Sequence, residues 1–413
     1  MKHITSKLLS LLLCLAMLMS MVPAAYADVE TEGASGKNTP TETNGGASEQ
    51  DDAYDDAPDT AVVQSTAAAT TDAAKVGETG YTTLADAITA AKDGDTVTLL
   101  ADRTEDVTIT TSITLDLGGK TLTNTSAGKA TISVTGGTVT VKNGTVIGGA
   151  SYYNIEVTKN SNADLILENV TATAGNTGSS MIDNWGTLTI NSGSYTGGMN
   201  TVKSEEGSTL VINNGTFTCD YGKKWSYTAT ILVYGDTTIN GGTVYGAAGG
   251  VSLNRGKLVV NGGTITSKGT GTTGDWGDGT GKQDAAAINV NAKYEETSVE
   301  IKGGTITAEK DAILLTNGKN GTIAVSGGTF SSKVLPEYCA TGFVPKDNGD
   351  GTCGVEVDTS VAEVNGVKYK TLQAAIDAAL RKATVKLLAD TKENVTISTP
   401  YVTLELNGHN LNG

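Results

Sequence analysis

A short motif recurs along the middle of this 413-residue chain, and it limits the possible folds more than any other feature of the sequence. Each copy has two alternating apolar positions, a small polar turn, and a hydroxyl residue followed by an apolar one, as in Thr237–Val244 and Leu258–Ile265. The hydroxyl residues lie at positions 145, 171, 194, 216, 243, 264, 305 and 329, at intervals of 21 to 27 residues with one exception of 41. Such self-similarity is typical of a solenoid built from stacked units.

Short strands with a period of two and one turn per unit predict an all-β protein, a parallel β-helix over residues 76–335. The chain lacks the Leu and Asn at fixed offsets that leucine-rich repeats require. Its repeat is also shorter than a propeller blade, which needs about 40 to 50 residues. Neighbouring coils of a β-helix pair about 4.8 Å apart, so equivalent positions form columns. The longest interval corresponds to one coil with an insertion at about residues 269–284. The expected inward column comprises Val141, Leu167, Ile190, Ile212, Ile239, Val260, Ile301 and Val325, and a second column ends in Val244, Ile265, Ile306 and Phe330.

The composition agrees with a narrow core. Aromatic residues make up only 5% of the chain, which is too little bulk for a conventional helical core but suits an interior one side chain wide. Asn recurs at positions 191, 213, 240 and 261, and its amide can bond from one coil to the next, so these positions predict an internal asparagine ladder.

A longer repeat frames the solenoid. Over the 30 positions that start at Tyr81 and at Tyr369 we count 17 identities. The unit predicts an amphipathic capping helix, which covers the exposed edge of the first coil with Leu84, Ala87, Ile88 and Ala91. Residues 362–413 are therefore expected to be a truncated second copy of the capping helix and first coil. We expect either a fragment of a longer protein or a terminal cap.

The N-terminal 75 residues predict export and disorder rather than a folded unit. Lys2 and Lys7 precede an apolar stretch at 8–22, and a small-x-small pattern ends at Ala27, so residues 1–27 are predicted to be a signal peptide cleaved after Ala27. Residues 28–75 hold eleven Asp or Glu, two Lys and no Phe, Leu, Ile or Trp, which predicts a disordered acidic linker. We therefore expect a secreted or cell-surface protein without a membrane span after signal removal.

The charge and the histidine content exclude several classes of function. A formal net charge of −16 argues against a nucleic-acid partner, because a phosphate backbone requires a basic surface. With one His after signal removal, His409, most histidine-based catalysis and nearly all zinc chemistry are excluded.

The framing unit carries a resemblance to a known family. The pattern Tyr-x-Thr-Leu-x-x-Ala-Ile from Tyr81, followed by Thr-Val-x-Leu-Leu-Ala-Asp from Thr96, resembles modules of large secreted surface proteins of Gram-positive bacteria. These modules belong with the pectin-lyase-like right-handed parallel β-helices. Residues 336–361 resemble the small turn module that closes such helices. The resemblance implies architecture more than activity, because the same superfamily contains lyases, hydrolases, adhesins and inert stalks.

In that superfamily the active site lies on an outer strand face, with carboxylates and Arg or Lys from adjacent coils. The residues that we expect to point outward on three consecutive coils are Glu156, Asp183 and Lys203, with Trp185 beside them. Carboxylates on neighbouring coils would lie roughly 5 Å apart, as in retaining glycosidases. These three residues are the candidate catalytic residues, and ordinary solvated charge is the alternative.

Two further segments suggest ligand binding. Trp276 can stack on a sugar ring, and the neighbouring Asp275 and Asp278 could hold calcium, although their spacing lacks the alternating ligands of a calcium loop. Trp225 is a third candidate for glycan stacking. We expect no other cofactor and no dedicated metal site. Cys339 and Cys353 flank a Gly-rich turn and could form a disulfide outside the cell, with free thiols as the alternative.

Together these features predict a secreted structural or adhesive β-helix that binds glycans or host and cell-envelope surfaces weakly and at several points. The alternative is a polysaccharide lyase or glycoside hydrolase of the β-helix type. The sequence leaves the oligomeric state open.

Overall fold

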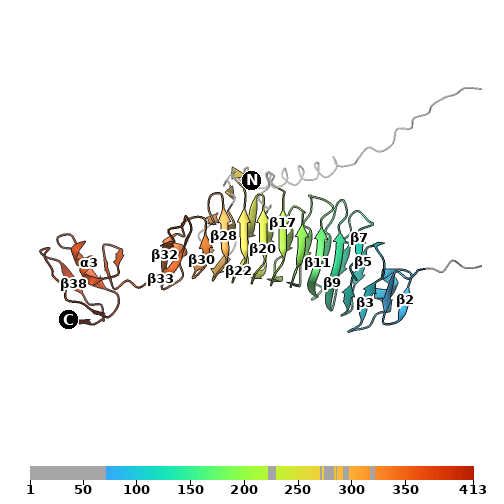
Figure 1. The fold of residues 1–413 in the computed structure, drawn as a ribbon, viewed down its shortest axis with the longest axis horizontal. Coiled ribbons are helices and arrows are strands. Elements are labelled where there is room, and N and C mark those ends of the chain that lie inside the picture. Colours follow the sequence, from blue (N-terminus) through green and yellow to red (C-terminus); the bar gives the residue numbers. More distant parts are fainter. Residues whose placement is uncertain are drawn as a thin grey trace, which may run out of the picture. The chain divides into compact units, whose positions relative to one another are not determined.

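The computed structural model describes residues 71–221, 229–269, 272–273, 283–284, 286–291, 297–316 and 321–413, and in this part the chain is a parallel β-solenoid followed by two small β-rich units. Strands of successive coils stack side by side along the solenoid (Figure 1). The predicted all-β fold and parallel β-helix are therefore confirmed. In the described part, no helix has the length and apolar character needed to cross a bilayer.

One face of each coil contributes a short strand to a nine-stranded parallel sheet, here called sheet B. Its strands are β5 (Val107–Ile109), β8 (Ile132–Val134), β10 (Ile155–Val157), β12 (Ile182–Asn184), β15 (Val202–Ser204), β18 (Ala229–Val233), β21 (Gly249–Leu253), β26 (Ile288–Asn291) and β29 (Ile313–Thr316). The pairing is in register from coil to coil, so side chains at equivalent positions form columns.

The rest of each coil belongs to a larger sheet, here called sheet A, in which a corner divides most coils into two strands. Before the corner lie β3 (Thr96–Leu99), β6 (Thr114–Asp116), β13 (Thr187–Ile190), β16 (Thr209–Ile212), β19 (Asp236–Ile239), β22 (Gly256–Val260), β27 (Thr297–Ile301) and β30 (Gly321–Val325). After it lie β4 (Arg103–Thr104), β7 (Thr121–Thr123), β14 (Gly193–Thr196), β17 (Thr216–Cys219), β20 (Thr243–Gly246), β23 (Thr264–Ser267), β28 (Thr305–Ala308) and β31 (Thr329–Phe330). In two early coils one long strand spans both parts, β9 (Thr138–Ile147) and β11 (Asp164–Thr173).

The core consists of the columns that the repeat predicts. All eight members of the first inward column, from Val141 to Val325, are at most 1% exposed. The second column contains Tyr195 and Phe217, whose rings stack with centroids 5.1 Å apart. The predicted hydroxyl column is also in register, since Thr216 pairs with Thr243 and Thr243 with Thr264. A core built by stacking needs few large side chains, which accounts for the low aromatic content.

The insertion also lies where the interval of 41 residues predicts it. Thr264 pairs directly with Thr305, so the intervening chain is one coil plus an excursion. The described part of that excursion is a short antiparallel hairpin of β24 (Thr272–Thr273) and β25 (Gln283–Asp284).

The corner of sheet A requires glycine and carries the asparagine ladder. Gly242 has φ +87°, and a Cβ there would lie 2.6 Å from the carbonyl oxygen of Gly215 on the preceding coil, so only glycine fits. One side of the corner holds the ladder, in which each Asn Nδ2 donates to the Oδ1 of the Asn on the preceding coil, at 2.7 to 2.8 Å. The bonds run from Asn213 to Asn191, Asn240 to Asn213 and Asn261 to Asn240. The ladder is formed as predicted, but it is solvent-exposed rather than internal.

A helix covers the first coil, as predicted. The helix α2 (Leu84–Ala90) buries Leu84, Ala87 and Ile88 against the coil, and Ala91 ends it at 8% exposure. The hairpin of β1 (Ala74–Val76) and β2 (Thr79–Tyr81) packs beside it, and β1 pairs with β3. Ala73 and Ala74 are fully buried, so the folded part begins inside the segment 28–75 that the sequence assigns to the linker. The other linker residues up to 70 and the predicted signal peptide lie outside the described residues.

The predicted closing module, residues 336–361, begins with the short helix η1 (Pro336–Tyr338) and is an antiparallel hairpin of β32 (Phe343–Asp347) and β33 (Cys353–Val357). It adjoins the last coil through the bridge between Phe330 and Cys353. Cys339 and Cys353 are free thiols in the structure, so strand pairing closes this loop without a disulfide. Cys219 is a buried free thiol.

Residues 362–413 repeat the first unit in structure as well as in sequence. The repeated elements are β34 (Ala362–Val364), β35 (Val367–Tyr369), α3 (Leu372–Asp377), β36 (Thr384–Leu387), β37 (Thr391–Lys392), β38 (Thr403–Glu405) and β39 (Leu411–Asn412). Thr83 and Thr371 each accept a hydrogen bond from the backbone N–H three residues later, at 3.0 and 3.2 Å. The unit has its own core of residues such as Leu372 and Val385.

The two copies differ where a second coil covers the first. Ile109 and Leu117 are fully buried beneath β8 and β9 in the first copy. Their counterparts Ile397 and Leu406 are 47% and 45% exposed. Residues 395–397 correspond to β5 but form no strand, because the next coil supplies the hydrogen bonds that make β5 a strand.

Candidate functional site

The outer face of sheet B brings together the three residues that the sequence singled out. Glu156 pairs with Asp183, and Asp183 pairs with Lys203, so they occupy one outward column on consecutive strands β10, β12 and β15. Each is the middle residue of a three-residue strand whose flanking side chains, such as Ile155 and Val157, point into the core. The alternation of the strand thus places them outside. Their predicted placement is correct, while their catalytic role stays a prediction.

Asp183 has an unusual environment for an outward-facing carboxylate. Asp183 is only 2% exposed, and its Oδ2 atom accepts a hydrogen bond from the Trp185 indole Nε1 at 2.9 Å. The other oxygen, Oδ1, is buried without a hydrogen-bond partner. Burial, followed by the negative charge of Glu205, raises the pKa of Asp183 to about 7, although Lys203 and the indole N–H act in the opposite direction. A carboxyl group that titrates near neutrality marks a candidate functional site.

Glu205 is the member of this site that sequence reasoning missed. It follows β15 directly, at the position that Trp185 occupies after β12, and it is 8% exposed. Its carboxylate forms an ion pair with the Lys203 ammonium. Lys203 therefore serves mainly to balance Glu205. The only sequence signal for Glu205 was its position near Lys203, in the same acidic turn as Glu206. Acidic turns are usually solvated, so this signal did not mark Glu205 as part of a site.

Tyrosines border the carboxylates on the side of the preceding coil. The rings of Tyr152 and Tyr153 lie 4.5 Å apart, and burial, followed by the charge of Asp183, raises the pKa of Tyr153 to about 12. The Glu156 carboxylate accepts a hydrogen bond from Ser133 at 2.9 Å. These contacts give the face both apolar rings and charged oxygens.

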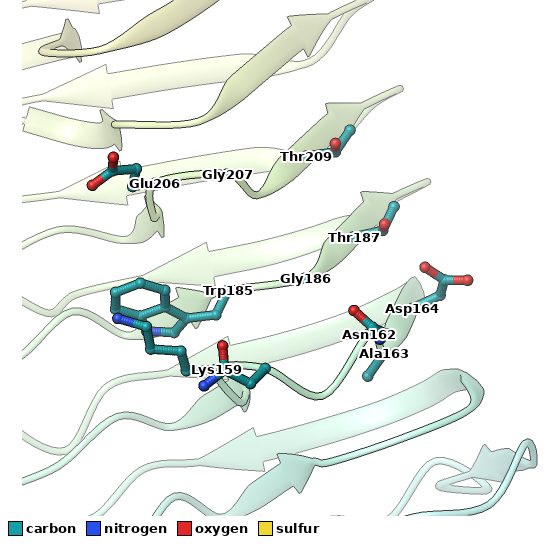
Figure 2. A pocket seen from close by; sticks show the side chains of 11 residues that line it. Lys159, Asn162, Ala163, Asp164, Trp185, Gly186, Thr187, Glu206, Gly207 and Thr209 are labelled. Carbon is teal, nitrogen blue, oxygen red and sulfur yellow. The ribbon is translucent and has the colours of Figure 1, made fainter.

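A polar groove of about 370 Å³ opens next to these carboxylates, where the chain turns from sheet B to sheet A. Figure 2 shows the side chains of Lys159 and Trp185 side by side at one end of it. The Lys159 Nζ atom lies 4.2 Å from the centroid of the Trp185 ring, a cation–π contact. Because the same indole bonds to Asp183, the groove and the buried carboxylates form one continuous site.

At the opposite end of the groove, a column of side chains presents hydroxyl and carboxylate oxygens. Asp164 pairs with Thr187 and Thr187 with Thr209, so these residues lie on three consecutive coils (Figure 2). Because paired strands of neighbouring coils lie about 4.8 Å apart, these side chains form a row of hydrogen-bonding groups along the direction in which the strands stack. Glu206, on the same side of the groove as Trp185 and Lys159 (Figure 2), forms an ion pair with Arg255 at 2.7 Å.

The remaining predicted ligand-binding residues cannot be placed. Trp225, Trp276, Asp275 and Asp278 lie outside the described residues. Within the described part, no group of three or more His, Cys, Asp or Glu side chains is arranged to hold a metal ion. The calcium expectation therefore rests on the sequence alone.

Comparisons with known proteins add no name to this site. No protein-family model, no curated protein and no solved structure matches the chain.

Proposed function

We propose that this protein is a secreted or cell-surface β-helix of the pectin-lyase-like type that binds glycans through the groove beside Trp185. The observation that carries this proposal is the partly buried Trp185 indole, which is held by its own N–H hydrogen bond and flanked by a row of hydroxyl and carboxylate oxygens. Glycan sites combine an aromatic platform for the sugar face with polar groups for its hydroxyls. The export signal in the sequence and the extended, repetitive surface agree with an adhesive role.

The polar character of the groove supports weak binding that becomes useful through repetition. Its lining offers one aromatic ring and several charged or hydroxyl groups, and no deep apolar cavity. Such a site contributes modest affinity, and display of many copies on a surface raises the overall avidity.

A glycan array followed by calorimetric titration tests this proposal. We expect the full chain to bind a subset of glycans and Trp185→Ala to weaken that binding by at least about fivefold, since stacking on an indole contributes roughly 1 kcal/mol or more. Trp185→Phe, which preserves apolar surface, should retain part of the affinity. Tyr401→Ala removes another exposed ring, 68% exposed in the second copy, and serves as the matched control. Binding that is unchanged in Trp185→Ala contradicts the proposal.

A polysaccharide-cleaving enzyme is the second candidate, because carboxylates of adjacent coils lie together and Asp183 titrates at about 7. A general acid needs to be protonated near the working pH, and this pKa meets that requirement. A general acid must also touch the scissile bond, and Asp183 is 2% exposed behind Trp185. This burial favours the binding function.

The enzyme candidate has a direct assay. Lyase action on uronic-acid polymers produces ultraviolet absorbance, and hydrolysis releases reducing ends. Turnover that disappears in Glu156→Gln and Asp183→Asn, but persists in Glu168→Gln on the outer side of sheet A, would establish it. Absence of turnover over a broad glycan panel, together with Trp185-dependent binding, leaves the binding function.

A further inference from the structure

The binding groove contains a positively charged side chain of the protein itself, that of Lys159. Lys159 is an exposed side chain whose ammonium could remain fully hydrated, yet its Nζ atom lies 4.2 Å above the Trp185 ring (Figure 2). An indole face attracts cations through its quadrupole. The lysine therefore marks the place where this groove prefers an ammonium group.

The surroundings of the indole strengthen that preference. The Trp185 N–H donates to the Asp183 carboxyl at 2.9 Å, and above the Asp183 pKa of about 7 this acceptor is an anion that increases the electron density of the ring. The second oxygen of Asp183 is buried, so a charge on this carboxyl group is only weakly screened. Glu205 adds a further carboxylate next to Asp183.

The charges on the groove lining favour a cationic ligand as well. Apart from Lys159 the charged lining residues are Asp164 and Glu206, both acidic. Glu206 is neutralised by Arg255, while Asp164 accepts a hydrogen bond from the Thr138 hydroxyl at 3.3 Å. The groove lining other than Lys159 therefore carries acidic charge, with Asp164 at the end opposite Trp185.

We propose that the glycan bound in this groove is an amino-sugar polymer, whose ammonium group displaces Lys159 from the face of Trp185. This inference rests on the proposed glycan-binding function and names its substrate class. In the column of Asp164, Thr187 and Thr209, the carboxylate accepts hydrogen bonds from the sugar hydroxyls, and the two Thr hydroxyls both donate and accept. Lys159 acts as an internal competitor, so the free protein covers its own aromatic platform.

The test compares two oligosaccharides with the same sugar backbone, one with free amino groups that can carry a positive charge and one with neutral N-acetyl groups. Titration of the full chain with glucosamine tetrasaccharide and with its fully N-acetylated form, followed by calorimetry and by the indole N–H resonances, should show about tenfold tighter binding of the charged form. Lys159→Gln should tighten binding of the charged form about threefold, because the competitor is removed. Lys129→Gln, at an exposed lysine outside the groove, is the matched control and should change nothing.

The outcomes separate this inference from the proposed function. Equal affinity for the two tetrasaccharides, lost for both in Trp185→Ala, overturns the amino-sugar assignment and leaves glycan binding intact. Unchanged affinity in Lys159→Gln likewise overturns the role of Lys159 as a competitor. Tighter binding of a lysine-containing tripeptide than of glucosamine tetrasaccharide overturns the assignment in favour of a protein ligand. Failure of every glycan to bind overturns both proposals.

Discussion

The outer surfaces of sheets A and B use the same backbone in different ways. On sheet A the outward positions repeat, with Asn bonded to Asn at the corner and a column of hydroxyl residues beside it. On sheet B the outward column changes from coil to coil, from Ser133 to Glu156, Asp183 and Lys203. A column that repeats stabilises the stack, whereas a column that varies supplies particular side chains at particular places.

Hydrogen-bond satisfaction does not separate the two sheets, because buried polar atoms without a partner in the described part also occur on sheet A, at Arg103 Nε, Thr237 Oγ1 and Thr297 Oγ1. Each ladder amide on sheet A finds a partner on the neighbouring coil. On sheet B, Asp183 Oδ1, Ser252 Oγ and Asn289 Nδ2 are buried and have no partner within the described residues. Buried polar atoms without partners reduce stability, and proteins tolerate them where function requires them. The difference between the outward columns leads us to expect that the repeated Asn and hydroxyl columns are architecture and that the varied column carries the chemistry. Four substitutions test it.

The largest expected effect comes from neutralising Asp183. Its folded-state pKa of about 7 lies above the ordinary value of 3.8, so its contribution to stability is fully present below pH 3.8 and is lost as the pH rises through about 7. Asp183→Asn keeps an acceptor for the Trp185 N–H and removes the charge. Relative to the unmodified protein, we expect no difference at pH 4 and a gain of about 2–4 kcal/mol in the free energy of unfolding at pH 8.

Urea denaturation of both proteins at a series of pH values measures this gain. Lys203, Glu205, Glu156 and Tyr153 face the same carboxyl group and remain in both proteins, so their titration largely cancels in the difference. A difference that stays constant from pH 4 to pH 8 would show that Asp183 is an ordinary surface carboxylate. The contrast between the two sheets would then fail.

A smaller effect is expected from the ladder on sheet A. Asn213→Ala removes two side-chain hydrogen bonds, to Asn191 and from Asn240, and should lower the free energy of unfolding by about 1 kcal/mol because the bonds are exposed. Asn261→Ala removes one such bond and should cost about half as much. Chemical denaturation checks both values, and glycan affinity should be unchanged. A loss of glycan binding in Asn213→Ala would mean that the asparagine ladder also takes part in recognition.

The smallest effect belongs to the hydroxyl column. Thr216 is exposed on β17, and Val has a strand propensity at least as high, so Thr216→Val should change the free energy of unfolding by less than about 0.5 kcal/mol. Thermal unfolding and the glycan titration both report on it. A clear drop in glycan affinity with unchanged stability would give this column a binding role.

Sequence reasoning succeeds for the parts of this molecule that repeat. The inward columns, the hydroxyl column and the capping helix were predictable because apolar periodicity and register impose them on every coil. The outward position of Glu156, Asp183 and Lys203 followed from the same register. The ladder was predictable as a set of bonds, but its exposure was not, since the sequence does not show which side of the corner faces solvent.

The site depends on features that occur once, and these were harder to see. Glu205 reaches the Asp183 carboxyl because it follows a strand that ends on Ser204, and no repeating pattern marks that turn. The contact of Lys159 with Trp185 joins residues of different coils across a groove, and sequence spacing does not reveal it. The raised pKa of Asp183 depends on burial by side chains from several coils, which only the folded structure defines.

The uncovered coil of the second copy has a consequence for how such a chain acquires its structure. Residues 395–397 lack the strand that β5 forms at the equivalent place, where β5 pairs with β8, so the first strand of this sheet becomes regular only when a second coil pairs with it. The helix α2, by contrast, completes the first coil from the N-terminal side without any later residue. Regular structure in the first coil therefore depends on contacts from both directions along the chain, with the helix supplied by earlier residues and the paired strand by later ones.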